Sequence, residues 1–211
     1  MKFKKEKASE INGKPIFMYV NRMEGYPKVF VSGGMHKYEN TKRSAMSLIT
    51  GKMSLCELNL FNDLYNNLDL YIVPDINPIN YAGLNRSFLP EKEFREYKFI
   101  EDTGPFSLAL DLHADVEDET FYMYERRHSN RSIMRHVMRR IKKFSDIGEK
   151  QNNHKNEGTL EEHHWRKGTT WSITTEAPGK CEKSFSDMVN TMTVLYAMET
   201  FLWINKAPDS Q

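Results

Sequence analysis

Cysteine is scarce in this chain of 211 residues, which contains only Cys56 and Cys181, far apart and without a CxxC spacing. The sequence therefore excludes a disulfide framework and a cysteine-rich zinc site, and it favours a reducing, cytoplasmic location. An excess of charge of one sign is also lacking, since 30 Lys and Arg residues face 29 Asp and Glu residues. This balance argues against a dedicated nucleic-acid binder and against a polybasic membrane binder.

Long apolar runs are absent too, and none approaches the ~18 residues that a membrane-spanning helix needs. The basic start MKFKKEKASE has no apolar stretch behind it, so we expect no secretory signal and no membrane partner. The length predicts one domain over residues 1–211, with residues 1–12 as a disordered start. The most polar stretch, residues 145–167, is predicted as a surface loop. The sequence leaves the oligomeric state open.

Short, almost wholly apolar runs alternate with segments of helical periodicity. The predicted strands cover residues 15–21, 28–32, 68–73, 106–112, 121–124 and 170–175, and the predicted helical segments cover 41–67, 132–144 and 185–203. Strands of this kind belong to sheets that helices cover on both faces. The sequence therefore predicts an α/β fold, a three-layer α/β/α domain with a mixed, mostly parallel central sheet.

Such sheets bind ligands beyond the carboxyl ends of their strands. His36 and Glu39 follow the strand 28–32 and two glycines, and a His and a Glu three residues apart can share one cation. A second HxxE, His154 to Glu157, lies in the polar stretch with no strand before it, and we interpret it as a chance occurrence.

A catalytic zinc commonly has three protein ligands and keeps one position for water. His113 follows the strand 106–112 and is the candidate third ligand. Asp111 shares a strand face with His113 and is a candidate outer carboxylate for its ring. Glu176 follows the strand 170–175, where a carboxylate could act as general base.

Asn85 and Arg86 stand in the segment NPINYAGLNRSF that follows the strand 68–73. The planar guanidinium of an arginine pairs with a carboxylate through two hydrogen bonds, and a neighbouring asparagine adds a neutral donor. This pair predicts a binding site for the free carboxylate of a substrate.

Four motifs, in this order, resemble the zinc metallocarboxypeptidase superfamily, which includes the succinylglutamate desuccinylase and aspartoacylase branch. They are GGMHKYE (33–39), INP followed by LNRSF (76–88), LDLH (110–113) and TTEAP (174–178). The resemblance implies a zinc-carboxypeptidase-like fold and one Zn²⁺ per chain. It further implies that His36, Glu39 and His113 bind the zinc, that Asn85 and Arg86 bind the substrate carboxylate, and that Glu176 is the general base.

The chain departs from that family at three points. Gly83 stands where the family usually has an Asp that supports the first zinc-binding His, residues 68–84 contain no Arg, and residues 125–175 contain no Tyr. Arg126 and Arg127 are candidates to replace the missing cation. Other candidate substrate contacts, from the polar loop, are His164 and Arg166.

We therefore expect a zinc-dependent hydrolase that cleaves an amide bond next to a free carboxylate, in a peptide or a peptidoglycan fragment. One alternative is an N-acyl amino acid deacylase of the desuccinylase or aspartoacylase type. A second alternative is a non-catalytic zinc-containing domain that binds carboxylates, which the missing Asp, Arg and Tyr favour.

Overall fold

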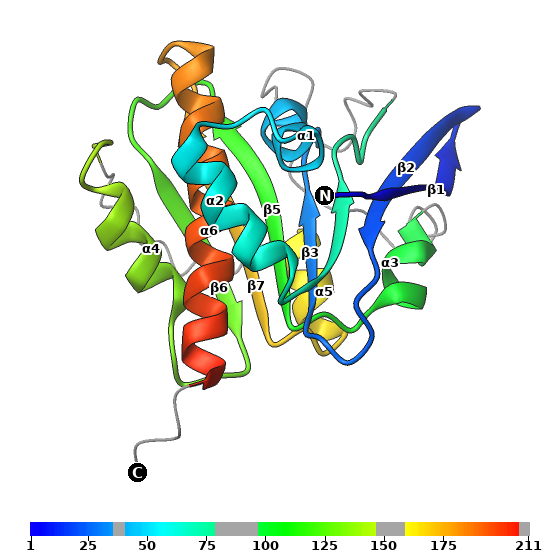
Figure 1. The fold of residues 1–211 in the computed structure, drawn as a ribbon. Helices are drawn as coiled ribbons and strands as arrows, with labels where there is room; N and C mark the ends of the chain where they lie inside the picture. Colours follow the sequence, from blue (N-terminus) through cyan, green and yellow to red (C-terminus); the bar gives the residue numbers. More distant parts are fainter. Residues whose placement is uncertain (36–40, 79–96, 147–158, 207–211) are drawn as a thin grey trace.

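The computed structural model describes residues 1–35, 41–78, 97–146 and 159–206. Within these residues a seven-stranded sheet forms the middle layer, with the strand order β1-β2-β4-β3-β5-β7-β6 (Figure 1). Its strands are β1 (Lys4–Ile11), β2 (Lys14–Asn21), β3 (Lys28–Ser32), β4 (Asp69–Val73), β5 (Leu108–Asp115), β6 (Tyr122–Arg127) and β7 (Trp171–Pro178).

The four central strands, β4, β3, β5 and β7, run parallel to one another. The outer strands are antiparallel to their neighbours, with β1 beside β2, β2 beside β4, and β6 beside β7. The predicted mixed sheet with a parallel centre is therefore confirmed. The carboxyl ends of β3, β5 and β7 lie at one edge of the sheet, where β5 and β7 extend beyond β3. This is the edge at which the candidate site residues were predicted.

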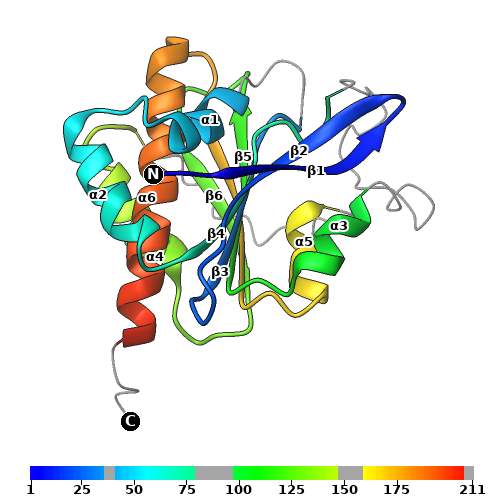
Figure 2. The ribbon, with the colours of Figure 1, turned by 45° about the vertical axis from the view of Figure 1, so that its right-hand side comes forward.

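Helices cover both faces of the sheet, as Figure 2 shows from the side. One face carries α1 (Lys42–Thr50), α2 (Leu55–Tyr65), α4 (Ile133–Ile141) and the long α6 (Lys183–Lys206). The other face carries α3 (Lys98–Thr103) and α5 (Leu160–Arg166). The three-layer α/β/α arrangement is confirmed. No helix in the described parts of the chain combines the length and the apolar character that crossing a membrane requires.

Alternation along β5 divides its side chains between the two faces. Leu108, Leu110 and Leu112 enter the apolar core that includes residues of α6, whereas Ala109 packs in the second core on the side of α3 and α5. Asp111 and His113 share the face of Ala109. The polar residues of β5 therefore face the thinner helical layer.

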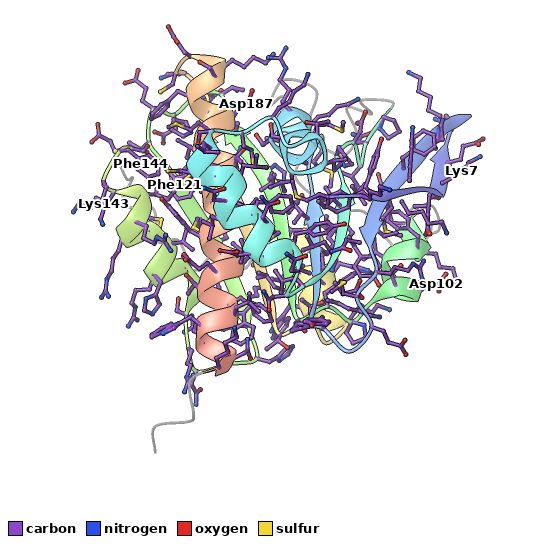
Figure 3. All side chains as sticks on the ribbon, in the orientation of Figure 1. Lys7, Asp102, Phe121, Lys143, Phe144 and Asp187 are labelled. Atoms are coloured by element: carbon purple, nitrogen blue, oxygen red, sulfur yellow. The ribbon has the colours of Figure 1, made fainter. Side chains whose placement is uncertain are left out.

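The predicted helical segment 41–67 is two helices. The chain leaves α1 at Gly51 with a left-handed φ of 67°, and α2 begins at a capping box formed by Ser54 and Glu57. Figure 3 labels Asp187 near the start of α6, where its Oδ1 accepts a hydrogen bond from the Ser44 hydroxyl of α1 at 3.3 Å. The break at Gly51 lets both short helices follow the same face of the sheet.

Two predictions about irregular segments are wrong. Residues 4–11 of the expected disordered start form β1. Asn12 and Gly13, both with positive φ, make a tight hairpin turn that pairs β1 with β2. Part of the expected polar loop 145–167 forms α5, which begins where the Thr159 hydroxyl accepts a hydrogen bond from the Glu162 backbone N–H.

Candidate active site

His113 and Glu176 lie side by side on adjacent parallel strands. They are register partners in the pairing of β5 with β7, so their side chains project from the same face of the sheet. Both strands extend further than predicted, so the two residues lie within strands rather than after their ends. A histidine and a carboxylate are thus held next to each other by backbone hydrogen bonds, as a metal ligand beside a general base would have to be.

Asp111 orients the imidazole of His113. Its Oδ2 lies 2.9 Å from His113 Nε2, and its Oδ1 accepts a hydrogen bond of 2.8 Å from the hydroxyl of Ser32, at the end of β3. All three residues are buried. Burial pushes the pKa of Asp111 upward, but the charge and hydrogen bond of His113 and the Ser32 hydroxyl outweigh it and hold the pKa below its usual range. The predicted outer carboxylate therefore contacts the ring as expected.

The chain beyond β3 is anchored at the same edge of the sheet. Gly33 donates its N–H to the Val73 carbonyl at 3.0 Å, and the Asn77 side chain donates to the Met35 carbonyl at 2.9 Å. A Cβ at position 33 would lie 2.9 Å from the Thr41 carbonyl oxygen, so the close approach of these segments requires glycine there. The segment that leads to the HxxE motif therefore starts beside the Asp111 network.

Several predicted site residues lie outside the described residues. They are His36 and Glu39, Asn85 and Arg86, the departure at Gly83, and the chance motif of His154 and Glu157. Their predicted roles remain predictions.

Two tyrosines of β6 join the site, although the sequence analysis assigned them no role. Tyr122 is the register partner of Glu176 on the side opposite His113, and its hydroxyl donates to Asp115 Oδ2 at 2.6 Å. Tyr124 pairs with Thr174 one step along the same face. Burial is the main cause that raises the pKa of both phenols, and the charge of Glu176 raises them further, so both hydroxyls stay protonated. The alternation Tyr-Met-Tyr was the signal that could have identified them.

Glu161 of α5 is a buried carboxylate that the sequence analysis also missed. Its Oε1 lies 3.1 Å from Arg126 Nε, and its Oε2 accepts a hydrogen bond of 3.3 Å from the Thr174 hydroxyl. Burial raises the pKa of Glu161 to about 7, with Arg126 and Thr174 opposing the shift. Arg126, a candidate substrate contact, is therefore engaged with a carboxylate of this chain.

Arg127 lies on the other face of the sheet, away from Glu176. It forms an ion pair of 2.5 Å with Glu125 and donates from Nε to the Ser129 carbonyl. Glu125 also accepts the backbone N–H groups of Ile133 and Met134 at the start of α4. The structure thus brings Arg126, but not Arg127, to the face that carries His113.

The two candidates from α5 differ in burial. His164 is buried between the rings of Phe30 and Phe106, and burial is the main cause that lowers its pKa to about 3. Among the residues that the structure describes, none makes a hydrogen bond with its Nε2. Arg166 is exposed and pairs with Glu162 at 2.6 Å. His164 therefore belongs to the core beneath the site, and Arg166 to the surface.

The donor set at this edge suits a zinc ion in its chemistry. His113 is a buried imidazole oriented by a carboxylate, which is the usual environment of a zinc-bound histidine. Within the described ranges, no group of three or more His, Cys, Asp and Glu side chains could hold a metal ion. Two of the three predicted ligands lie outside those ranges, so the described residues include one predicted ligand, His113, and the carboxylate of Asp111 that contacts its ring.

The sequence matches no protein-family model and none of the curated proteins. Solved structures do match its fold. A Shewanella baltica protein, provisionally assigned as a metallopeptidase, superposes with a TM-score of 0.71 at 17% identity, over 94% of this chain and 86% of that one. A metallo-carboxypeptidase from Burkholderia cenocepacia gives a TM-score of 0.70 at 14% identity, over 96% and 65% of the two chains.

A metallo-carboxypeptidase from Pseudomonas aeruginosa, solved with (2-guanidinoethylmercapto)succinic acid, gives a TM-score of 0.66 at 15% identity, over 95% of this chain and 64% of that chain. At these identities the likeness establishes the fold. The fold that the sequence motifs implied is therefore confirmed, and this chain spans about two thirds of the length of the two carboxypeptidases.

Proposed function

We propose that this chain, which shares its fold with metallo-carboxypeptidases, is a zinc-dependent hydrolase that cleaves an amide bond next to a free carboxylate. The observation that carries the proposal is the pairing of His113 with Glu176 at the same register of two parallel strands. This arrangement sets an oriented imidazole beside a carboxylate at the edge where sheets of this class bind ligands.

One Zn²⁺ would be held by His36, Glu39 and His113. Because His113 Nε2 is engaged by Asp111, its metal-binding atom would be Nδ1. The hydrogen bond between Ser32 and Asp111 supports this set, since it fixes the end of β3, from which the HxxE motif follows, against β5. A bound zinc ion supplies a water of lowered pKa and polarises the carbonyl group.

The residues of the chain would then move one proton. A carboxylate oxygen of Glu176 takes a proton from the attacking water as the water adds to the amide carbonyl carbon. The protonated Glu176 delivers that proton to the leaving amine when the C–N bond breaks. Asp111 keeps the His113 ring in one orientation throughout, and Asn85 and Arg86 would bind the substrate carboxylate.

The substrate would be a peptide or peptidoglycan fragment with a free carboxylate, or, as the alternative, an N-acyl amino acid. The P. aeruginosa metallo-carboxypeptidase was solved with a derivative of succinic acid, which supports a small carboxylate as ligand. A non-catalytic carboxylate-binding domain remains the second alternative, because Arg126 is paired with Glu161 rather than available in place of the missing family Arg.

Metal content and turnover test this proposal together. We expect about one zinc per chain in the wild type, and loss of zinc in both His36→Ala and His113→Ala. Glu176→Gln should keep its zinc and lose roughly 10²- to 10⁴-fold in kcat, as removal of a general base does. Glu10→Gln, an exposed carboxylate on β1, is the matched control and should keep full activity.

A panel of C-terminal peptides and N-acyl amino acids would separate the substrate classes. Cleavage of acyl amino acids alone would establish the deacylase. If the zinc-loaded wild type cleaves no member of the panel, the non-catalytic domain is favoured, and full activity in Glu176→Gln would refute the assignment of the base.

A further inference from the structure

Tyr122 reaches across a whole strand. It stands on β6, whereas Asp115, which accepts its hydroxyl at 2.6 Å, stands on β5, and β7 lies between the two strands. Because Tyr122 is the register partner of Glu176, its side chain projects from the same face of the sheet. The phenol therefore crosses β7 on the face that carries Glu176.

Both ends of this bridge are fixed. The backbone of Tyr122 is paired with β7, and Asp115 Oδ1 accepts the Glu117 N–H at 2.9 Å, which leaves Oδ2 directed to the phenol. The Asp115 carbonyl accepts the N–H of Gly179 at 2.9 Å, and a Cβ at position 179 would lie 2.3 Å from that oxygen. The ends of β5 and β7 are thus packed as closely as backbone allows.

Glu176 consequently stands between two fixed rings in one row across the sheet. His113 lies on one side, oriented by Asp111, and Tyr122 lies on the other side, oriented by Asp115. A general base must be held close to one geometry, because a misplacement of about 1 Å can cost on the order of 100-fold in rate. A carboxylate on a flexible glutamate side chain needs neighbours that restrict its rotamers.

We propose that Tyr122 and Asp115 are positioning residues that confine the Glu176 carboxylate to the His113 side of the row, an inference that rests on the proposed role of Glu176 as base. The phenol ring limits the rotamers of Glu176, and the hydrogen bond to Asp115 keeps the ring in place. Tyr122 stays protonated and donates to Asp115, so the pair takes no part in the proton transfer itself.

Tyr122→Phe tests the hydrogen bond while it keeps the ring. We expect kcat to fall about tenfold with KM unchanged within about twofold and zinc content unchanged. Asp115→Ala should give a similar fall, and the double variant should lose no more than either single one. Asp115→Asn, which keeps an acceptor oxygen for the phenol, should restore much of the rate. The matched control is Tyr71→Phe, which removes another buried Tyr–Asp hydrogen bond, of 2.9 Å to Asp69, far from Glu176 on β4.

A crystal structure of each variant gives a readout that does not depend on turnover. We expect one conformer of the Glu176 carboxylate in the wild type and in Tyr71→Phe, and a rotated or divided carboxylate in Tyr122→Phe. An unchanged carboxylate in Tyr122→Phe would overturn the inference whether or not the wild type hydrolyses a substrate. Equal losses of kcat in Tyr122→Phe and Tyr71→Phe would also overturn it and leave the hydrolase proposal intact, whereas an inactive wild type would count against the hydrolase proposal alone.

Discussion

Arg126 Nε on β6 lies 3.1 Å from Glu161 Oε1 on α5, and the Glu161 side chain is almost entirely buried. The pair joins a strand at the edge of the sheet to the short helix above it, 35 positions further along the chain. Burial opposes the charged form of Glu161 more strongly than Arg126 and Thr174 favour it, which is why its pKa rises to about 7. The charge of the Glu161 side chain therefore changes with pH near neutrality.

The stability of the protein should reflect this raised pKa. The folded state binds the Glu161 proton more tightly than the unfolded state, in which the carboxyl has its ordinary pKa of 4.5. The resulting stabilisation is fully present when the pH is below the ordinary pKa, and it is lost as the pH rises through about 7. The free energy of unfolding falls by about 3 kcal/mol over this range. We expect the free energy of unfolding of Glu161→Gln, minus that of the wild type, to increase between pH 5 and pH 8 in urea titrations. A constant difference over that range would show that Glu161 ionises normally.

Asp111 should influence zinc affinity without binding the metal. Asp111→Asn keeps the size of the side chain but weakens its hold on His113 Nε2, and loss of such an outer carboxylate typically costs about 10- to 100-fold in metal affinity. Competition with a chromogenic chelator measures this change.

The matched control is Asp69→Asn, which changes another buried aspartate of the sheet, hydrogen bonded to Tyr71 on β4. It should leave zinc affinity at the wild-type value. Equal affinities of Asp111→Asn and the wild type would contradict the arrangement in which His113 binds zinc through Nδ1.

His164 should make the protein sensitive to acid. Burial lowers the pKa of His164 in the folded state from 6.5 to about 3. The folded state therefore keeps its full stability above the unfolded-state pKa of 6.5 and loses stability as the pH falls below 6.5. The loss between pH 6.5 and pH 5 amounts to about 2 kcal/mol. His164→Phe, which continues the aromatic packing of Phe30 and Phe106, should remove this loss.

The measurement is the difference in unfolding free energy between His164→Phe and the wild type at pH 6.5 and at pH 5. His164 Nε2 makes no hydrogen bond within the described part of the chain, so the substitution removes none that the structure shows at that atom. A difference that does not grow as the pH falls would mean that the imidazole is protonated within the folded protein.

Much of the architecture could be predicted from the sequence. Apolar runs bounded by turn residues predicted β3 exactly and β4 to within one residue, because a strand buried on both faces has a continuous apolar pattern. Alternation on β5 predicted that Asp111 and His113 share a face, and the hydrogen bond between them confirms it. Local patterns were sufficient here because each feature depends on residues close in sequence.

The remaining features depend on pairs that are distant in sequence. Glu161 is buried because Arg126 meets it from another element, and nothing in the polar run LEEHHWR reveals that contact. Its helix could have been found from the cap, since Thr159 and Glu162 have the spacing of a capping box. The bridge from Tyr122 to Asp115 required the order of β5, β7 and β6 in the sheet, which no local pattern supplies.

Behind the row of His113 and Glu176, a single amide of α6 joins the two strands that carry them. Asn190 accepts the Thr175 hydroxyl at 2.9 Å and donates to the His113 carbonyl at 3.2 Å, and its side chain is buried. A shift of β5 along β7 would break these two hydrogen bonds of Asn190 as well as the backbone hydrogen bonds between the strands. The spacing between the backbones of His113 and Glu176 is thus set when the sheet folds. A molecule that binds there can be accommodated by its own conformation or by rotation of these two side chains.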